Sequence, residues 1–195
     1  MEQLSFFSAD LAEPVAEDLA GLLAAPGQLV TAAGAVRISV VVADPWRVEG
    51  LAELVVGTGL VAERGTSDEG RPLVRTAPDA RLVGLARSWT RGAVKTVPPG
   101  WTPSPWALRA WVLAAGRPDD AGYVLGLDPH AADTHQPLAG ALSRAGMAAT
   151  LLGARGGGPG LRIAGRRRLL RLCQTVGAAP GNAATPPDGW PGAGT

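Results

Sequence analysis

Two short segments rich in Leu, Ala and Gly divide this chain into two similar halves. The first segment reads L-A-G-L-L-A-A-P-G at 19–27, and the second reads L-R-A-W-V-L-A-A-G at 108–116. Their first residues lie 89 positions apart (108 − 19), and Leu82 and Leu169 lie 87 apart (169 − 82). A nearly constant offset of this size predicts a duplicated unit whose two copies fold in the same way.

The pattern of apolar, polar and turn-forming residues predicts the same order of elements in each copy, α-β-β-α-β-β-α. The predicted fold class is therefore α/β, of the α+β type, with this unit present twice. In the first copy we expect helices at 14–25, 45–57 and 79–91, and strands at 28–33, 35–42, 60–64 and 71–76. In the second copy we expect a motif helix starting at 105, helices at 131–145 and 166–176, and strands at 116–120, 123–127, 147–152 and 161–164.

Composition sets the boundaries of the parts. Residues 1–96 form the first repeat and residues 104–178 the second. The segment 97–103 between them contains three prolines, which predict a stiff linker. From residue 179 to 195, Pro, Gly and Ala dominate, and this composition predicts a disordered tail.

Two helix starts carry a recognisable signal. Asp44 and Ser104 each precede a proline at the first position of a predicted helix. Short polar side chains at this place accept hydrogen bonds from the first free backbone amides. We therefore expect both residues to act as N-caps.

The two motifs resemble a known family. The first resembles the LAGLIDADG motif, and the second, at 109–116, is more similar to the motif of the WhiA group of sporulation regulators, which carry non-catalytic LAGLIDADG domains. The residues that match the first motif are Leu19, Ala20, Gly21, Leu22, Ala25 and Gly27. The resemblance covers residues 11–178. It implies that the two motif helices pack closely along a pseudo-twofold axis, and that two sheets form one saddle that lies on duplex DNA.

The resemblance also has a consequence for catalysis. A LAGLIDADG nuclease needs an acidic residue near the end of each motif helix to hold divalent metal. The matching positions here are Pro26 and Ala115, and the other usual acid is replaced by Ala24 and Leu113. None of these side chains binds a hard cation, so we expect no nuclease activity, no metal and no cofactor. WhiA-group proteins also carry a helix-turn-helix module, which is not recognised here, so DNA affinity is expected from the saddle alone.

Charge is distributed unevenly along the chain. Residues 1–80 carry a net charge of −7 (5 − 12), and residues 81–195 carry +8 (13 − 5). This asymmetry favours a polyanionic partner on one side of the molecule. We expect Arg37, Arg75, Arg155 and Arg162 to face duplex DNA, and the arginines of the last helix to position it through phosphate contacts. The last-helix candidates are Arg166, Arg167, Arg168 and Arg171.

Two other functions stay open at this point. A regulatory protein-interaction module would use the saddle, or the arginines of the last helix, to bind an acidic protein. It would show an apolar sheet face built from Tyr123, Leu125 and Leu127, where a DNA-binding protein would show arginines. A metal-dependent enzyme would use a cluster of possible ligands. These ligands are Asp128, His130, Asp133 and His135.

Bulk properties place further limits on function. No apolar run reaches the roughly 18–20 residues that cross a bilayer, and no signal peptide is apparent, so no membrane partner is expected. The single cysteine, Cys173, forms no internal disulfide and suits a cytoplasmic location. Because the duplication supplies its own twofold interface, we expect a monomer.

Overall fold

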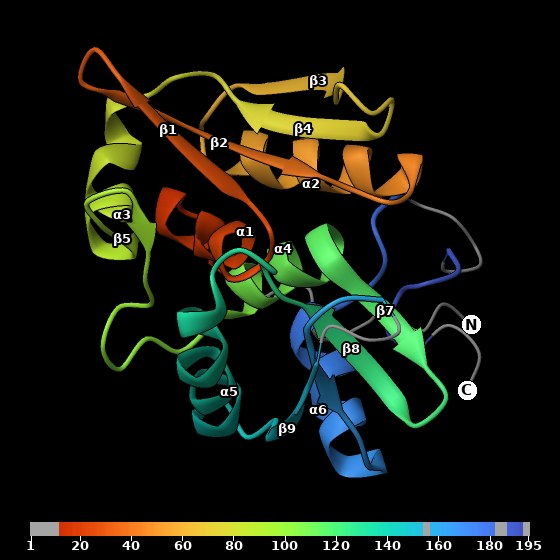
Figure 1. Cartoon of the computed structure of the whole chain (residues 1–195). Coiled ribbons are helices and arrows are strands. Elements are labelled where there is room, and N and C mark those ends of the chain that lie inside the picture. The colour runs from red at the N-terminus through yellow and green to blue at the C-terminus, as the bar shows by residue number, and fades with distance from the viewer. Residues whose placement is uncertain (1–11, 154–156, 182–186, 193–195) are drawn as a thin grey trace.

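The computed structural model describes residues 12–153, 157–181 and 187–192 (Figure 1). The helices of the first half are α1 (Ala20–Ala24), entered through a 3-10 turn at Ala16–Leu19, α2 (Pro45–Gly57) and α3 (Val83–Trp89). Its strands are β1 (Gln28–Ala32), β2 (Ala35–Val41), β3 (Ala62–Thr66), β4 (Pro72–Thr76), β5 (Thr90–Arg91) and β6 (Val94–Lys95).

The second half repeats this order. Its helices are α4 (Pro105–Ala115), α5 (His135–Arg144) and α6 (Arg166–Val176). Its strands are β7 (Gly116–Asp119), β8 (Gly122–Gly126), β9 (Ala149–Leu152) and β10 (Gly160–Ile163). The predicted α-β-β-α-β-β-α unit is therefore present twice, and only the short β5–β6 hairpin was not predicted.

The two large sheets have the same topology. Their strand orders are β1-β2-β4-β3 and β7-β8-β10-β9, and all neighbouring strands run antiparallel. Equivalent positions are paired across the two central strands: Ser39 lies opposite Arg75, and Val124 lies opposite Arg162. Arg75 and Arg162 are 87 residues apart (162 − 75), so the repeat seen in the sequence is a repeat in space.

The two motif helices, α1 and α4, lie side by side at the centre of the molecule (Figure 1). Their contact depends on Gly21, because a Cβ there would collide with the carbonyl oxygen of Ala107 and lie 2.9 Å from the Cβ of Ala110. Small residues thus allow the backbones to approach closely, as the motif predicted. At the start of α4, Ser104 accepts a hydrogen bond from the amide of Ala107 at 3.0 Å and confirms the predicted cap.

The segment 187–192 differs from the predicted disordered tail. Trp190 is 3% exposed and packs edge-on against Trp46 of α2, with ring centroids 6.3 Å apart. Its indole nitrogen donates to the carbonyl of Gly177, and Arg109 of α4 stacks on its ring at 4.9 Å. A tryptophan buries a large apolar area, which the Pro/Gly-rich composition around it concealed. Within the described residues, no helix is both long and apolar enough to cross a membrane.

Candidate nucleic-acid interface

The first sheet has one face on the core and one turned away from it, here called its open face. Burial alternates along β2, where Val36, Ile38 and Val40 are buried and Arg37 and Ser39 are partly exposed. This alternation was predicted from the sequence, because successive side chains of a strand point to opposite faces. Arg37 therefore lies on the open face.

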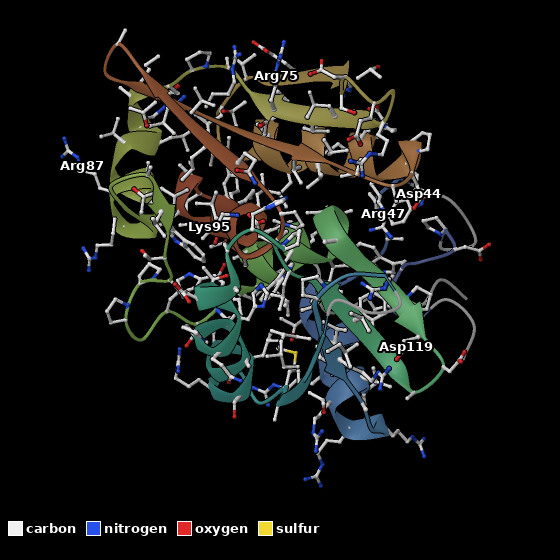
Figure 2. The ribbon with its side chains drawn as sticks, in the orientation of Figure 1. Asp44, Arg47, Arg75, Arg87, Lys95 and Asp119 are labelled. Carbon is white, nitrogen blue, oxygen red and sulfur yellow. The ribbon has the colours of Figure 1, made fainter. Side chains whose placement is uncertain are left out.

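The register extends this open face across β4 and β3. Arg75 lies opposite Ser39, and Glu63 lies opposite Arg75. Arg75 Nε donates to Glu63 Oε2 at 2.7 Å, and Arg37 Nη2 lies 3.6 Å from the same oxygen. Figure 2 shows Arg75 on the side of the first sheet away from α2. Two predicted DNA contacts are thus brought together, around one carboxylate that partly neutralises them.

The open face of the second sheet also carries arginines. Arg162 of β10 and Arg117 of β7 both lie opposite Val124, one on each side of β8. Arg162 forms an ion pair with Asp119, which Figure 2 shows on the β7–β8 hairpin. Across the strands of both large sheets, the open faces present four arginines and two carboxylates, a net charge of +2 (4 − 2).

The apolar residues that would favour a protein-binding saddle lie on the other face. Tyr123, Leu125 and Leu127 are all buried in the core. Tyr123 donates its hydroxyl hydrogen to the carbonyl of Gly189 at 2.7 Å, and burial raises the pKa of this tyrosine well above its usual range. The observed distribution, with arginines outside and apolar side chains inside, is the one that we associated with DNA.

Arg117 is a candidate that the sequence analysis missed. It forms no hydrogen bond or ion pair within the described part of the chain. Its guanidinium lies beside the glycine-rich turn before β10, where a Cβ at Gly157 would be 3.4 Å from Nη2. The signal was weak because β7 is short and contains Pro118, which interrupts the alternation typical of a strand.

A cleft of about 610 Å³ lies where the two open faces meet. Open-face residues from both sheets line it, namely Val41 of β2, Arg117 of β7 and Gly126 of β8. Pro26 and Ala115, at the ends of the two motif helices, line it as well. The cleft therefore joins residues of both sheets with the ends of both motif helices.

A buried cation closes the end of α4. The guanidinium of Arg47 donates to three carbonyl oxygens there, those of Val112 (3.0 Å), Leu113 (3.1 Å) and Gly116 (2.7 Å). Its Nε pairs with Asp44 at 2.9 Å (Figure 2). Asp44 occupies the N-cap position of α2 and is followed by proline, as predicted, but its carboxylate makes no cap bond and instead pairs with Arg47.

A second buried cation closes the end of α1. The ammonium of Lys95 donates to the carbonyls of Gly27 (2.7 Å) and Ala25 (3.3 Å), on either side of Pro26. It also pairs with Asp128 at 2.7 Å. Figure 2 shows Lys95 directed toward α1 in the middle of the molecule. Positive side chains at a helix C-terminus satisfy its free carbonyls and complement its dipole.

Burial and pairing act against each other at this second site. Burial lowers the pKa of Lys95 and outweighs the bond from Asp128, which acts to raise it. Burial also acts to raise the pKa of Asp128, but bonds from Lys95, the His130 amide and Gln28 prevail and hold this pKa below its usual range. The carboxylate of Asp128 is thus stabilised in its charged form.

The side chains that were predicted as a metal-ligand cluster around Asp128 make other contacts in the structure. Within the described residues, no three His, Cys, Asp or Glu side chains come together as a group that could hold a metal ion. Asp128 binds Lys95, and the Nε2 of His135 lies 2.8 Å from the main-chain oxygen of Asp128. The geometry gives no support to a metal-dependent enzyme at this place.

The arginines of α6 are not brought together with those of the open faces. Leu172 and Val176 bury one side of α6 in the core, on the opposite side of the second sheet from Arg162. The four candidates on this helix are exposed and face away from the saddle: Arg166, Arg167, Arg168 and Arg171. The remaining candidate, Arg155, lies outside the described residues.

Comparison with known proteins concerns the fold. The sequence matches no family model and no curated protein. The homing endonuclease I-WcaI, solved bound to its DNA recognition sequence, has a similar fold, with a TM-score of 0.57 and 11% identity over 82% of this chain and 79% of that one. The N-terminal LAGLIDADG domain of DUF199/WhiA gives a TM-score of 0.49 and 14% identity over 85% and 82% of the two chains. The protein has a LAGLIDADG-like fold, as its two motifs predicted.

Proposed function

We propose that this protein binds duplex DNA without cutting it. The observation that carries the proposal is the set of arginines on the open faces of two equivalent sheets that meet at one cleft. Guanidinium groups bind phosphate oxygens and base edges in a fixed geometry. The endonuclease with a similar fold, which was solved bound to DNA, supports DNA as the partner.

The two motif-helix ends support the absence of cleavage. Divalent metal needs oxygen ligands with negative charge, and Pro26 and Ala115 offer no side-chain ligand. Instead, Lys95 and Arg47 already occupy the main-chain carbonyls at the two ends. A metal ion there would meet a positive charge where it needs a carboxylate, so the residues present do not fit the metal of a nuclease.

The individual residues then have distinct roles. Arg117 and Arg162 of the second sheet supply phosphate contacts near the cleft, and Arg37 and Arg75 of the first sheet reach the adjoining part of the duplex. We further propose that the bound protein is a monomer in the cytoplasm that regulates transcription. The internal pairing of α1 with α4 supports the monomer, and the lone Cys173 supports a reducing compartment.

Substitutions that replace charged side chains on the open faces with uncharged ones test DNA binding. Replacing Glu63 with Gln and Asp119 with Asn frees Arg75 and Arg162 from their carboxylates, so binding to mixed duplex fragments should tighten. Replacing Arg75 and Arg162 with Gln should weaken it and reduce the slope of log affinity against log salt by about 0.9 for each phosphate that is no longer neutralised. The matched control changes Arg87 and Arg91, exposed arginines outside the two open faces, to Gln. If no variant differs from the unchanged protein, the open faces do not bind DNA.

A plasmid-nicking assay tests the absence of cleavage. Purified protein with magnesium or manganese should leave supercoiled plasmid intact at concentrations that saturate DNA binding. Metal-dependent nicking by the rigorously purified protein would contradict the proposal.

A further inference from the structure

The arginines of α6 have no acidic partner within the described residues. Arg166, Arg167 and Arg171 form no ion pair within the described residues, and Arg168 donates only to the carbonyls of Ala148 and Ala164. By contrast, five arginines of the first half each have a carboxylate within 2.7–2.9 Å. Within the described residues, the positive charge of α6 is therefore not neutralised.

An apolar pocket lies directly beside these arginines. It has a volume of about 770 Å³ and lies between α6, the β7–β8 turn and the segment 187–192. Its α6 wall consists of residues spaced i, i+3, i+4 and i+7, which form one helix face: Arg166, Leu169, Leu170 and Cys173. Trp190 and Pro191 form the wall opposite. Leu170 is 54% exposed at the edge of this pocket, which is unusual for a leucine within a charged surface.

The pocket favours a protein partner over nucleic acid. Asp119, Asp120 and Arg166 line the pocket together with leucines and a tryptophan. The apolar groups that a duplex exposes are small thymine methyls within the major groove, which do not fill a pocket of this size. A protein segment can supply both a bulky apolar side chain for the pocket and acidic side chains for the arginines of α6.

We propose that this pocket and the arginine row of α6 bind an acidic protein segment that carries one bulky apolar side chain. The apolar side chain enters the pocket between Leu170 and Trp190, and flanking Asp or Glu residues pair with Arg166 and Arg167. The arginines of α6 lie on the core side of the second sheet, and the pocket meets the open face at Asp119, the partner of Arg162.

Fluorescence anisotropy with short labelled peptides tests this proposal. The probe is a heptapeptide of alternating Asp and Glu with a central Phe, measured against the full chain at about 50 mM and about 200 mM salt. It should bind, and higher salt should weaken it because exposed charges are screened. Replacing its Phe with Ala should weaken binding about tenfold, which corresponds to the loss of one buried apolar side chain. Replacing its acids with Lys should abolish binding.

Variants of the protein test where the labelled peptide binds. Replacing Arg166 and Arg167 with Glu, or Leu170 with Asp, should weaken peptide binding at least about tenfold and leave duplex binding unchanged. These side chains are exposed, so the thermal melt should stay the same. Replacing Arg87 and Arg91 with Glu changes the net charge equally, away from any apolar pocket, and should have little effect on the peptide.

Three results would overturn the proposal. The first is no binding of the Phe peptide to the unchanged protein at low salt. The second is equal binding by the Arg166/Arg167 and Arg87/Arg91 variants, which would mean that only net charge matters. The third is displacement of the peptide by unlabelled duplex from the same site, which would assign α6 to nucleic acid. The first two results do not depend on whether the open faces bind DNA.

Discussion

At the end of each motif helix, a positive side chain binds main-chain carbonyls and pairs with an aspartate. The residue that supplies the positive charge differs between the two ends. At the end of α4, the cation is Arg47 from α2, and its partner Asp44 is 46% exposed. At the end of α1, the cation is Lys95 from β6, and its partner Asp128 is 4% exposed. The two aspartates occupy equivalent Asp-Pro dipeptides, 84 residues apart (128 − 44), but the two cations are not equivalent.

This difference shows what is required at each end. Duplication alone would have placed the cation at equivalent positions, yet residue 131, which is 84 residues after Arg47, is an alanine. A positive side chain that binds the last carbonyls of the helix is therefore the common element, whichever strand or helix supplies it. The two ends differ in how much each depends on its aspartate, because only the α1 end buries its aspartate.

The largest expected effect comes from breaking the buried ion pair at the end of α1. Replacing Lys95 with Met should lower the free energy of unfolding by about 3–5 kcal/mol, because Asp128 stays buried without its cation. Urea denaturation measures this loss. Adding Asp128→Asn removes the stranded charge and should recover part of the stability, which separates a lost ion pair from a packing defect. An unchanged urea midpoint for the single variant would show that Lys95 does not stabilise the helix end.

The next largest effect comes from the close contact between α1 and α4. Replacing Gly21 with Ala should lower the free energy of unfolding by about 1–3 kcal/mol. The added methyl group collides with the main chain of α4, so the two helices must move apart. Gly84 of α3 is a matched control, since a Cβ there has no neighbour within 4 Å. Gly84→Ala should stabilise the protein by roughly 0.5–1 kcal/mol through helix propensity. Equal thermal melts for the two variants would argue against a close approach of α1 and α4.

A smaller effect sharpens the comparison of the two ion pairs. A double-mutant cycle on Arg47 and Asp44 should give a coupling energy below about 1 kcal/mol, because one partner is half exposed and screened by water. The same cycle on Lys95 and Asp128 should give a larger value. If the two couplings are equal, burial of the aspartate is not what distinguishes the ends.

The smallest effect is a dependence on pH. The pKa of Asp128 is lowered by folding, so its charge contributes stability above the unfolded carboxyl pKa of about 3.9. This contribution is lost as pH falls through the lower folded pKa. The stability difference between the unchanged protein and Asp128→Asn should therefore be largest near neutral pH and shrink below about pH 4. A difference that stays constant to pH 3 would contradict this assignment.

The sequence predicted those features that depend on local pattern. The period of the apolar residues indicated the helices and strands, and the alternation along β2 placed Arg37 on the side of its strand opposite the buried valines and isoleucine. Both helix-end cations escaped prediction, because Arg47 and Lys95 meet their carbonyls across 69 and 68 residues. Pairings of this kind depend on how the halves pack, and a single sequence contains no local signal for them.

The sequence also could not predict which of the candidate arginines share one surface. Charge alone suggested that the α6 arginines and the sheet arginines act on one partner, whereas the helix lies on the core side of the second sheet. Arg117 was missed because Pro118 disturbs the pattern of its strand. Residues far apart in the sequence are assigned to one surface only when the faces of their elements are known.

The docking of Trp190 has a consequence for the order in which the chain folds during synthesis. Trp190 contacts Trp46, which precedes it by 144 residues (190 − 46). Long-range contacts of this kind form late, because the intervening chain must first be ordered. The first half emerges from the ribosome early, but its Trp46 lacks this contact until residue 190 has been made. The packing of α2 is therefore completed only after the second repeat has been made.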